Sequence, residues 1–308
     1  MEDAILLEVK QLYKSFEDVD AVADVSFCIR RGESVGIVGE SGCGKSTTAR
    51  VISGLEKPTS GQILFSGQPY VLKPGRGKRK INMVFQDPIA SFDGRMTVFA
   101  SLYEALNHTK RISKVLADPI IRQALATVEL PENYIDRRVN QLSGGECQRI
   151  GIARAILTEP ELLICDEATS ALDVSVQAQI IHLLQDLKKE KKLTYLFISH
   201  DLALVAGMCN RVLVMYGGRV VEEGSTSAVM TNPGHPYTRL LLSCGDAFAT
   251  QTDGSVSQMP AIPERMDGPV GACPFYAYCH LRTEKCEKEM PMLQTVGMDH
   301  RAACHLLK

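Results

Sequence analysis

Residues 39–46 read Gly39-Glu40-Ser41-Gly42-Cys43-Gly44-Lys45-Ser46 and fit the pattern G-x-x-x-x-G-K-[ST]. The glycines of this pattern let consecutive backbone N–H groups curl around phosphate oxygens, and the helix that follows adds the positive end of its dipole. The apolar, β-branched run 34–38 precedes the loop, and residues 47–52 continue with helical spacing. We therefore expect a strand, a phosphate-binding loop (P-loop) and a helix in this order.

The P-loop pattern assigns a chemical role to several of its residues. Lys45 is expected to reach the β- and γ-phosphates of a nucleotide, and the Ser46 hydroxyl to ligate Mg²⁺. An ordinary glycine-rich turn is the alternative, and the flanking strand and helix argue against it. The expected nucleotide-binding residues here are Gly39, Ser41, Gly42, Cys43, Gly44, Lys45, Ser46 and Thr47.

Composition narrows the class of protein. The chain has 308 residues, of which 45% are hydrophobic and 23% charged, enough for a large core and more than one subdomain. A net charge of −2 gives no general attraction to nucleic acid. The N-terminus lacks the pattern of a signal peptide and no stretch approaches the ~18 apolar residues of a membrane helix, so we expect a soluble chain. Ten cysteines then suggest buried thiols and a metal or cluster site rather than disulfides.

The pattern along the chain predicts an α/β fold with three zones. Residues 4 to about 80 are strand-rich and indicate a β layer against a nucleotide-binding core, whereas residues 89–152 are helical. The apolar runs 162–165 and 193–198 are typical of central parallel strands, and the helical run 174–189 between them makes a β-α-β crossover. After about residue 225 the composition shifts toward Pro, Gly, Cys and Met, which indicates an appended extension.

Acidic residues follow the first of these apolar runs. Asp166 closes the predicted strand, where its carboxylate can hold Mg²⁺, and Glu167 is placed to orient or deprotonate an attacking water. A solvated strand end is the alternative for an isolated Asp-Glu pair, but the P-loop upstream favours the catalytic interpretation. His200 follows the second run and could contact the γ-phosphate.

The motif Leu142-Ser143-Gly144-Gly145-Glu146 resembles the signature of the ATP-binding subunits of ABC transporters, with Glu146 where the family usually has Gln. The resemblance implies a RecA-like P-loop NTPase core over residues 4–228, with an antiparallel β layer and an α-helical subdomain at about 89–152. A small cysteine-containing extension, 229–308, would follow. It also implies ATP sandwiched between two subunits arranged head to tail, with Ser143, Gly144 and Gly145 facing the partner's γ-phosphate.

Other family elements match in the same order. The resemblance implies that Phe16 stacks on adenine, although an aromatic residue at this place is also compatible with plain packing. It implies that Gln86 is the switch glutamine and an Mg²⁺ ligand, that 170–173 is the loop crossing the dimer interface, and that His200 is the switch histidine.

The pentapeptide Gly234-His235-Pro236-Tyr237-Thr238, together with four tail cysteines, resembles the oligopeptide/dipeptide importer branch, which includes nickel importers. This branch implies a heterodimer with a second ATPase subunit, two permease subunits and an extracytoplasmic binding protein. The chain would lie peripherally at the cytoplasmic face of the cell membrane. Residues 91–96 depart from the expected Leu-Asn-Pro, so the surface facing the permease is expected to be unusual.

The tail cysteines predict a metal-containing site. Cys273, Cys279, Cys286 and Cys304 supply the four thiolates that suit a [4Fe–4S] cluster and also structural Zn²⁺. Zinc sites favour close C-x₂₋₄-C pairs, which these cysteines lack, and the resemblance to peptide importers favours the cluster. Zn²⁺ and four free thiols stay open as alternatives.

Several functions are compatible with these motifs. The leading hypothesis is an ATPase that energises import of di- or oligopeptides, and a nickel or metal-chelate importer of the same branch is the nearest alternative. A soluble ABC ATPase acting on ribosomes or DNA would normally have two cassettes or a long coiled coil, and this chain has neither. A module that binds ATP without hydrolysing it is opposed by intact Lys45, Asp166, Glu167 and His200.

Overall fold

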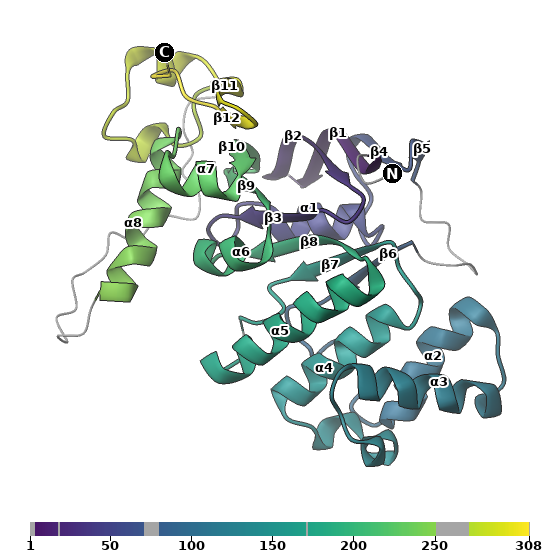
Figure 1. The fold of residues 1–308 in the computed structure, drawn as a ribbon. Helices are drawn as coiled ribbons and strands as arrows, with labels where there is room; N and C mark the ends of the chain where they lie inside the picture. Colours follow the sequence, from purple (N-terminus) through teal and green to yellow (C-terminus); the bar gives the residue numbers. More distant parts are fainter. Residues whose placement is uncertain (1–3, 18, 71–79, 171, 251–270, 308) are drawn as a thin grey trace. The chain divides into compact units, whose positions relative to one another are not determined.

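The computed structural model describes residues 4–17, 19–70, 80–170, 172–250 and 271–307. Two compact units divide the chain. Unit 1 consists of Met1–Val71 and Phe197–Lys308, and unit 2 of Leu72–Leu196. Figure 1 follows the chain through both units, and each is described below by itself.

Unit 1 contains an antiparallel sheet with strand order β2-β1-β4-β5. Strands β1 (Ile5–Phe16) and β2 (Val19–Arg30) form a long hairpin, followed by β4 (Ser60–Phe65) and the short β5 (Gln68–Pro69). This is the β layer that the sequence predicts, although β1 extends seven residues beyond the predicted Val9. Its register shifts between Val9 and Leu12, and the bulge lets the strand continue past a break in alternation.

A second sheet of unit 1 includes the strand that leads into the P-loop. Strand β3 (Ser34–Val38) is parallel to β9 (Arg211–Tyr216), and β10 (Arg219–Ser225) returns antiparallel to β9. All residues of β3 are buried, as its continuous apolar run predicts. Helix α6 (Leu202–Met208) packs on β3 at Gly36, where an added Cβ would lie 2.2 Å from Val205.

The C-terminal part of unit 1 adds two strands to this sheet. Strand β12 (His300–Ala302) pairs antiparallel with β10, and β11 (Gln294–Gly297) pairs with β12. Helices α7 (Thr226–Thr231) and α8 (Pro236–Thr250), the turn η3 (Tyr276–Tyr278) and helix α9 (Glu284–Lys288) complete the region.

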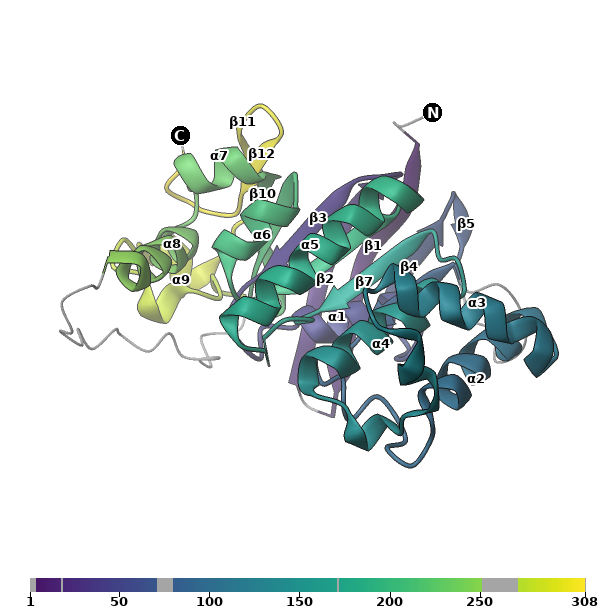
Figure 2. The ribbon, with the colours of Figure 1, turned by 60° about the horizontal axis from the view of Figure 1, so that its bottom comes forward.

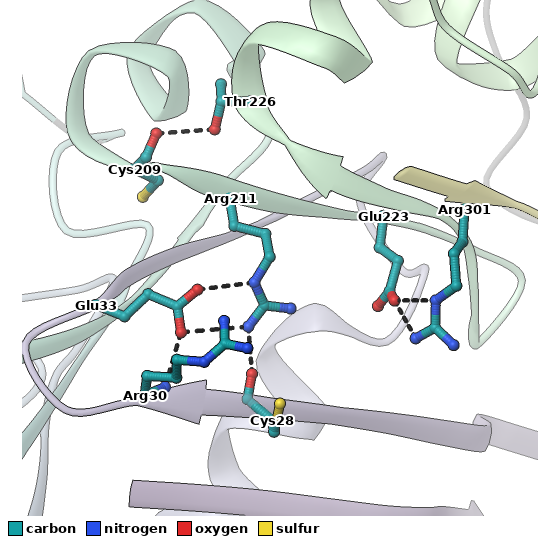
Figure 3. A network of polar contacts seen from close by, with 8 residues as sticks. All are labelled: Cys28, Arg30, Glu33, Cys209, Arg211, Glu223, Thr226 and Arg301. Carbon is teal, nitrogen blue, oxygen red and sulfur yellow. Dashed lines mark hydrogen bonds and ion pairs between the residues drawn. The ribbon is translucent and has the colours of Figure 1, made fainter. Parts of the chain in front are cut away.

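Ion pairs connect strands of this sheet to one another and to the turn that precedes β3 (Figure 3). On β12, Arg301 pairs with Glu223 of β10. On β9, Arg211 donates to the Glu33 carboxylate at 2.8 Å and to the carbonyl oxygen of Cys28. The turn between β2 and β3 is therefore held by the strand that lies next to β3.

Unit 2 contains a parallel strand pair and the helical zone of the chain (Figure 2). Strand β6 (Ile81–Val84) is parallel to β7 (Leu162–Asp166), and strand β8 (Thr194–Ser199) contains the boundary between the two units. Helices α2 (Val98–Lys110), α3 (Lys114–Thr127) and α4 (Gly144–Ile156) form the helical zone, with the short turns η1 (Glu132–Asp136) and η2 (Val139–Gln141) between α3 and α4. Helix α5 (Val174–Lys191) is the predicted crossover helix.

The helices of unit 2 begin at polar caps. The side chains of Thr97, Ser113 and Ser143 accept hydrogen bonds from the third backbone N–H of α2, α3 and α4, and Asp173 does the same for α5. The fold is thus mixed α/β with parallel and antiparallel sheets, as predicted. Among the described residues no helix combines the length and apolarity needed to cross a membrane.

Candidate active site

The P-loop connects β3 to α1 (Lys45–Ile52) in unit 1, as the pattern predicts. Gly39 and Gly44 have positive φ values of 152° and 103°. An added Cβ would lie 2.2 Å from the carbonyl oxygen of Met215 at Gly39 and 2.2 Å from that of Ala21 at Gly44. Only glycine lets the loop pass this close to β9 and β2 while presenting its backbone N–H groups.

The ammonium group of Lys45 lies against its own loop. Its Nζ donates to the carbonyl oxygens of Gly39 and Glu40, each at 2.7 Å, and the side chain is buried. Burial raises the pKa of the Cys43 thiol, against the opposing effect of the Lys45 charge. Ser41 and Gly42 are exposed at the tip of the loop, whereas Ser46 and Thr47 are half-buried in the first turn of α1.

Phe16 lies at the turn of the β1–β2 hairpin. It pairs with Val19, the residue is 43% exposed, and the Lys14 ammonium lies over its ring at 4.4 Å from the centroid. Ala21, two residues further along β2, is the residue that meets the P-loop at Gly44. Phe16 is therefore partly exposed on the hairpin that contacts the loop, which is compatible with the predicted stacking on adenine.

His200, also in unit 1, directly follows β8 and is exposed. The next residue, Asp201, caps α6 by accepting from the N–H of Leu204 at 3.0 Å, and its own N–H donates to Ser199 Oγ at 3.0 Å. The strand end and the helix cap thus fix the backbone on both sides of the imidazole.

In unit 2 the register of β6 and β7 brings Gln86 and Glu167 together. Val84 pairs with Cys165, so the residues two positions further along each strand face one another. Gln86 Nε2 donates to Glu167 Oε2 at 2.8 Å. Asp166, the last residue of β7, is 2% exposed. Three of the predicted hydrolytic residues therefore gather at the carboxyl ends of two parallel strands.

Glu167 has a left-handed backbone with φ 45°. This conformation is uncommon for a residue with a long side chain and is frequent at functional sites. The carbonyl oxygen of Glu167 accepts from both the N–H and the hydroxyl of Ser170, at 3.1 and 3.0 Å, and so stabilises the turn.

The signature motif opens helix α4. Ser143 N donates to Glu146 Oε2 at 2.7 Å, and Glu146 N donates to Ser143 Oγ at 3.3 Å, forming a capping box. The hydroxyl of Tyr134 donates to the other carboxylate oxygen at 2.5 Å, and this bond is the main cause of the lowered pKa of Glu146. A carboxylate at this position thus has partners for both oxygens, which explains how Glu146 replaces the usual Gln.

The segment that begins α5 packs against the signature motif. An added Cβ at Gly145 would lie 2.6 Å from Val176, and one at Gly144 would lie 3.6 Å from Leu172. Ser143 remains exposed at the helix start. Of the predicted interface loop 170–173, Ala171 lies outside the described residues.

The four tail cysteines are buried in unit 1, and the pKa of Cys273 indicates that they are neighbours. Burial, with smaller contributions from the nearby thiols of Cys286, Cys279 and Cys304, raises this pKa to about 11. Within the described ranges, however, no group of three or more His, Cys, Asp or Glu side chains is arranged to hold a metal ion. The predicted metal site therefore has no direct support and stays a prediction.

Sequence reasoning missed two tyrosines that contact the predicted motifs. Tyr134 binds Glu146, and Tyr237 binds the backbone of Glu40 in the P-loop. No sequence signal predicts the first contact. Tyr237 lies within the pentapeptide that served only to indicate a branch of the family.

Comparison with known proteins agrees with this geometry. Residues 22–170 match the ABC transporter family, and residues 221–286 match the oligopeptide/dipeptide transporter C-terminal region. The oligopeptide transport ATP-binding protein AppF of Bacillus subtilis (strain 168) is 42% identical over 299 residues, which cover 94% of this chain and 90% of that protein. The chain belongs to the ATP-binding proteins of ABC transporters. As a member of this family it is an ATPase.

Other ABC transporter ATP-binding proteins are similar over most of their length. The oligopeptide transport ATP-binding protein OppF of Escherichia coli (strain K12) is 40% identical, with 97% of this chain and 96% of that protein covered. Among solved structures, cbiO1 of Clostridium perfringens, part of the ABC transporter complex cbiONQ, is 30% identical with a TM-score of 0.65 over 75% of this chain and 92% of that one. A dimeric ATP-binding cassette bound to ADP and phosphate is 27% identical with a TM-score of 0.63, over 72% and 99%.

Proposed function

We propose that this ABC ATPase powers the import of di- or oligopeptides through partner permeases. The observation that supports the peptide substrate best is the match of residues 221–286 to the oligopeptide/dipeptide transporter C-terminal region. The relatives from B. subtilis and E. coli are named as oligopeptide transport proteins. A nickel or metal-chelate importer and a soluble ABC ATPase are the competing functions, and no specific observation favours either.

For hydrolysis we assign the central role to Glu167. Its carboxylate accepts a proton from water while the water oxygen attacks the γ-phosphorus, and the bond between the β,γ-bridging oxygen and that phosphorus breaks to give ADP and phosphate. Gln86, which donates to Glu167 at 2.8 Å, fixes the orientation of the carboxylate. His200 would contact the γ-phosphate, and Lys45 would bind the β- and γ-phosphates.

The oxygen donors suit Mg²⁺. Ser46, Gln86 and Asp166 are the hydroxyl, amide and carboxylate oxygens that would hold it, and Asp166 is a buried carboxylate at the end of a strand. When bound, Mg²⁺ would neutralise charge on the phosphates.

A second ATPase subunit would complete the site. Ser143 is exposed at the start of α4, where the helix N-terminus favours an anion, and Gly145 allows close packing against Val176. A similar cassette of known structure is dimeric. We infer a head-to-tail dimer, with a different ATPase chain as the partner, in which Ser143, Gly144 and Gly145 act on the ATP held by the partner's P-loop.

A cavity of about 1030 Å³ along α2 would receive a cytoplasmic helix of a permease. Phe99 and Tyr103 stack in its wall at 5.8 Å, and Glu104, Arg111 and Lys114 supply charges. The permeases, together with an extracytoplasmic binding protein, would hold the chain at the cytoplasmic face of the membrane.

The preceding segment, 91–96, is tied to α4. Arg154 donates to the carbonyl oxygen and hydroxyl of Ser91 at 2.7 and 2.9 Å, and its guanidinium stacks on Phe92 at 3.9 Å. These contacts offer a physical reason why the chain lacks the expected Leu-Asn-Pro.

The tail would hold a [4Fe–4S] cluster. Four buried neighbouring thiols are the donor set it needs, and once deprotonated they would bind it and tie the extension together. The cysteines lack the close C-x₂₋₄-C pairs that zinc sites favour, and this spacing supports the cluster over Zn²⁺.

Uptake in cells that encode this chain would test the proposal. Deleting its gene should abolish uptake of a labelled tetrapeptide and leave ⁶³Ni²⁺ uptake unchanged. Reintroducing the wild-type gene should restore peptide uptake, whereas the Glu167→Gln variant should not. Loss of nickel uptake alone would overturn the peptide substrate. Normal uptake of both would overturn transport.

A further inference from the structure

Tyr237 connects the C-terminal extension to the P-loop within unit 1. Its hydroxyl oxygen accepts a hydrogen bond from the backbone N–H of Glu40 at 2.9 Å, across 197 positions of sequence. The side chain of Tyr237 is completely buried. Burial is also the main cause that raises the pKa of this hydroxyl, so it stays neutral at physiological pH.

The peptide group on the other side of Glu40 is held as well. The carbonyl oxygen of Glu40 accepts from Lys45 Nζ at 2.7 Å, and the same ammonium also binds the carbonyl of Gly39. Glu40 is therefore held through its N–H by Tyr237 and through its C=O by the P-loop lysine.

Hydrogen bonds at the start of α8 fix the position of Tyr237. Glu222, fully buried on β10, accepts from the N–H groups of Gly234 and His235 at 2.7 and 2.8 Å and contacts His300 at 2.7 Å. His235 Nδ1 then accepts from the N–H of Tyr237 at 3.1 Å. Burial lowers the pKa of His235 to about 3, which keeps this nitrogen available as an acceptor. Gly234 is required because an added Cβ would lie 2.8 Å from Ala302.

Aromatic rings extend the connection to the cysteine-containing segment. The ring centroid of Tyr237 lies 4.6 Å from that of Tyr216 and 5.5 Å from that of Phe275, and Phe275 meets Tyr216 edge-on at 5.2 Å. Phe275 is two residues after Cys273. Pro274, between them, packs against the turn between β9 and β10, where an added Cβ at Gly217 would lie 3.0 Å from it. In the same turn, the N–H of Gly218 donates to the P-loop carbonyl of Cys43 at 3.1 Å.

We propose that Tyr237 is a positioning residue for ATP binding, through which the C-terminal extension holds the P-loop in its nucleotide-binding conformation. If the loop adopts this conformation in only a fraction of the molecules, the apparent affinity for ATP falls to the same fraction of its full value. The inference depends on ATP binding by the P-loop and is independent of the transported substrate.

The test compares two single-hydroxyl deletions in the full chain, Tyr237→Phe and Tyr216→Phe. Both rings belong to the same cluster, but the Tyr216 hydroxyl has no hydrogen-bond partner among the described residues. Losing the acceptor of a buried N–H should weaken ATP binding by roughly tenfold in Tyr237→Phe, measured by calorimetric titration, and leave Tyr216→Phe like the wild type. Hydrogen exchange at the Glu40 amide should accelerate by about tenfold in Tyr237→Phe only.

The measured affinities and exchange rates either support or overturn the proposed role of Tyr237. Unchanged affinity and exchange in Tyr237→Phe would overturn the proposal, as would equal losses in both variants, which indicate a general effect of the aromatic cluster. Faster exchange throughout β9 and β10, instead of at the P-loop, would also overturn it. A wild-type chain that does not bind ATP would contradict the ATPase assignment itself, a different result from a failure confined to Tyr237.

Discussion

Glu167 combines a left-handed backbone, with φ 45°, and a side chain that accepts a hydrogen bond from Gln86. We expect Glu167→Gln to keep ATP binding but to lower the rate of hydrolysis by ~10²–10⁴-fold, because the amide cannot accept the proton of the attacking water. Steady-state phosphate release by the assembled transporter, with the matching change in the partner ATPase, measures this. Glu161→Gln, which removes a carboxylate just before the same strand, is the control and should hydrolyse ATP normally. Near-normal turnover by Glu167→Gln would remove Glu167 from the mechanism.

Lys45 should contribute to binding rather than to chemistry alone. Removing its ammonium in Lys45→Ala deletes a charged donor to the phosphates, and we expect ATP affinity to fall by about 10–100-fold. Equilibrium binding of a fluorescent ATP analogue measures the effect. Arg50→Ala, which removes an exposed cation from the same helix, should bind as the wild type does. If the two variants bind equally, Lys45 does not contact the nucleotide.

Individual residues of the motifs were predictable because their chemistry depends on short spacing along the chain. The contact between Gln86 and Glu167 was not, since it arises from the register of β6 on β7, which no local pattern encodes. The contact of Tyr237 with Glu40 was also missed, because 197 positions of sequence separate the two residues.

At the scale of elements, two of the glycines in helix α4 have different surroundings. An added Cβ at Gly145 would lie 2.6 Å from Val176, whereas at Gly151 nothing lies within 4 Å. We expect Gly145→Ala to lower the free energy of unfolding by about 1–3 kcal/mol through overpacking. Gly151→Ala should raise it by roughly 0.5–1 kcal/mol because alanine favours helices. Urea unfolding of both variants measures the difference, and equal effects would contradict the packing of α4 on α5.

Elements with strong periodicity were predicted well, and those that depend on distant partners were not. The apolar run before the P-loop and the crossover helix occur as β3 and α5. Strands β11 and β12 were missed because they are only four and three residues long and exist through pairing with one another and with β10. The composition of the tail indicated an extension without indicating that it would join a sheet.

For the whole molecule, the state of the tail cysteines is a prediction that can be measured directly. Protein purified without oxygen should be brown and contain iron and acid-labile sulfide, about four of each per chain, because four thiolates match a [4Fe–4S] cluster. Substituting Cys286→Ser should lower both contents, whereas Cys147→Ser, a buried cysteine of unit 2, should change neither. Colourless protein with stoichiometric zinc, or with no metal, would exclude the cluster.

The central claim is that ATP hydrolysis by this chain drives peptides across a membrane. The most direct measurement follows ATP hydrolysis and accumulation of a labelled tetrapeptide together, in vesicles that contain this chain, its partner ATPase, both permeases and the binding protein. We predict that the peptide stimulates hydrolysis. Glu167→Gln, combined with the matching change in the partner, should lower accumulation and hydrolysis by a similar factor. Accumulation that continues at the wild-type rate in this variant would contradict the claim.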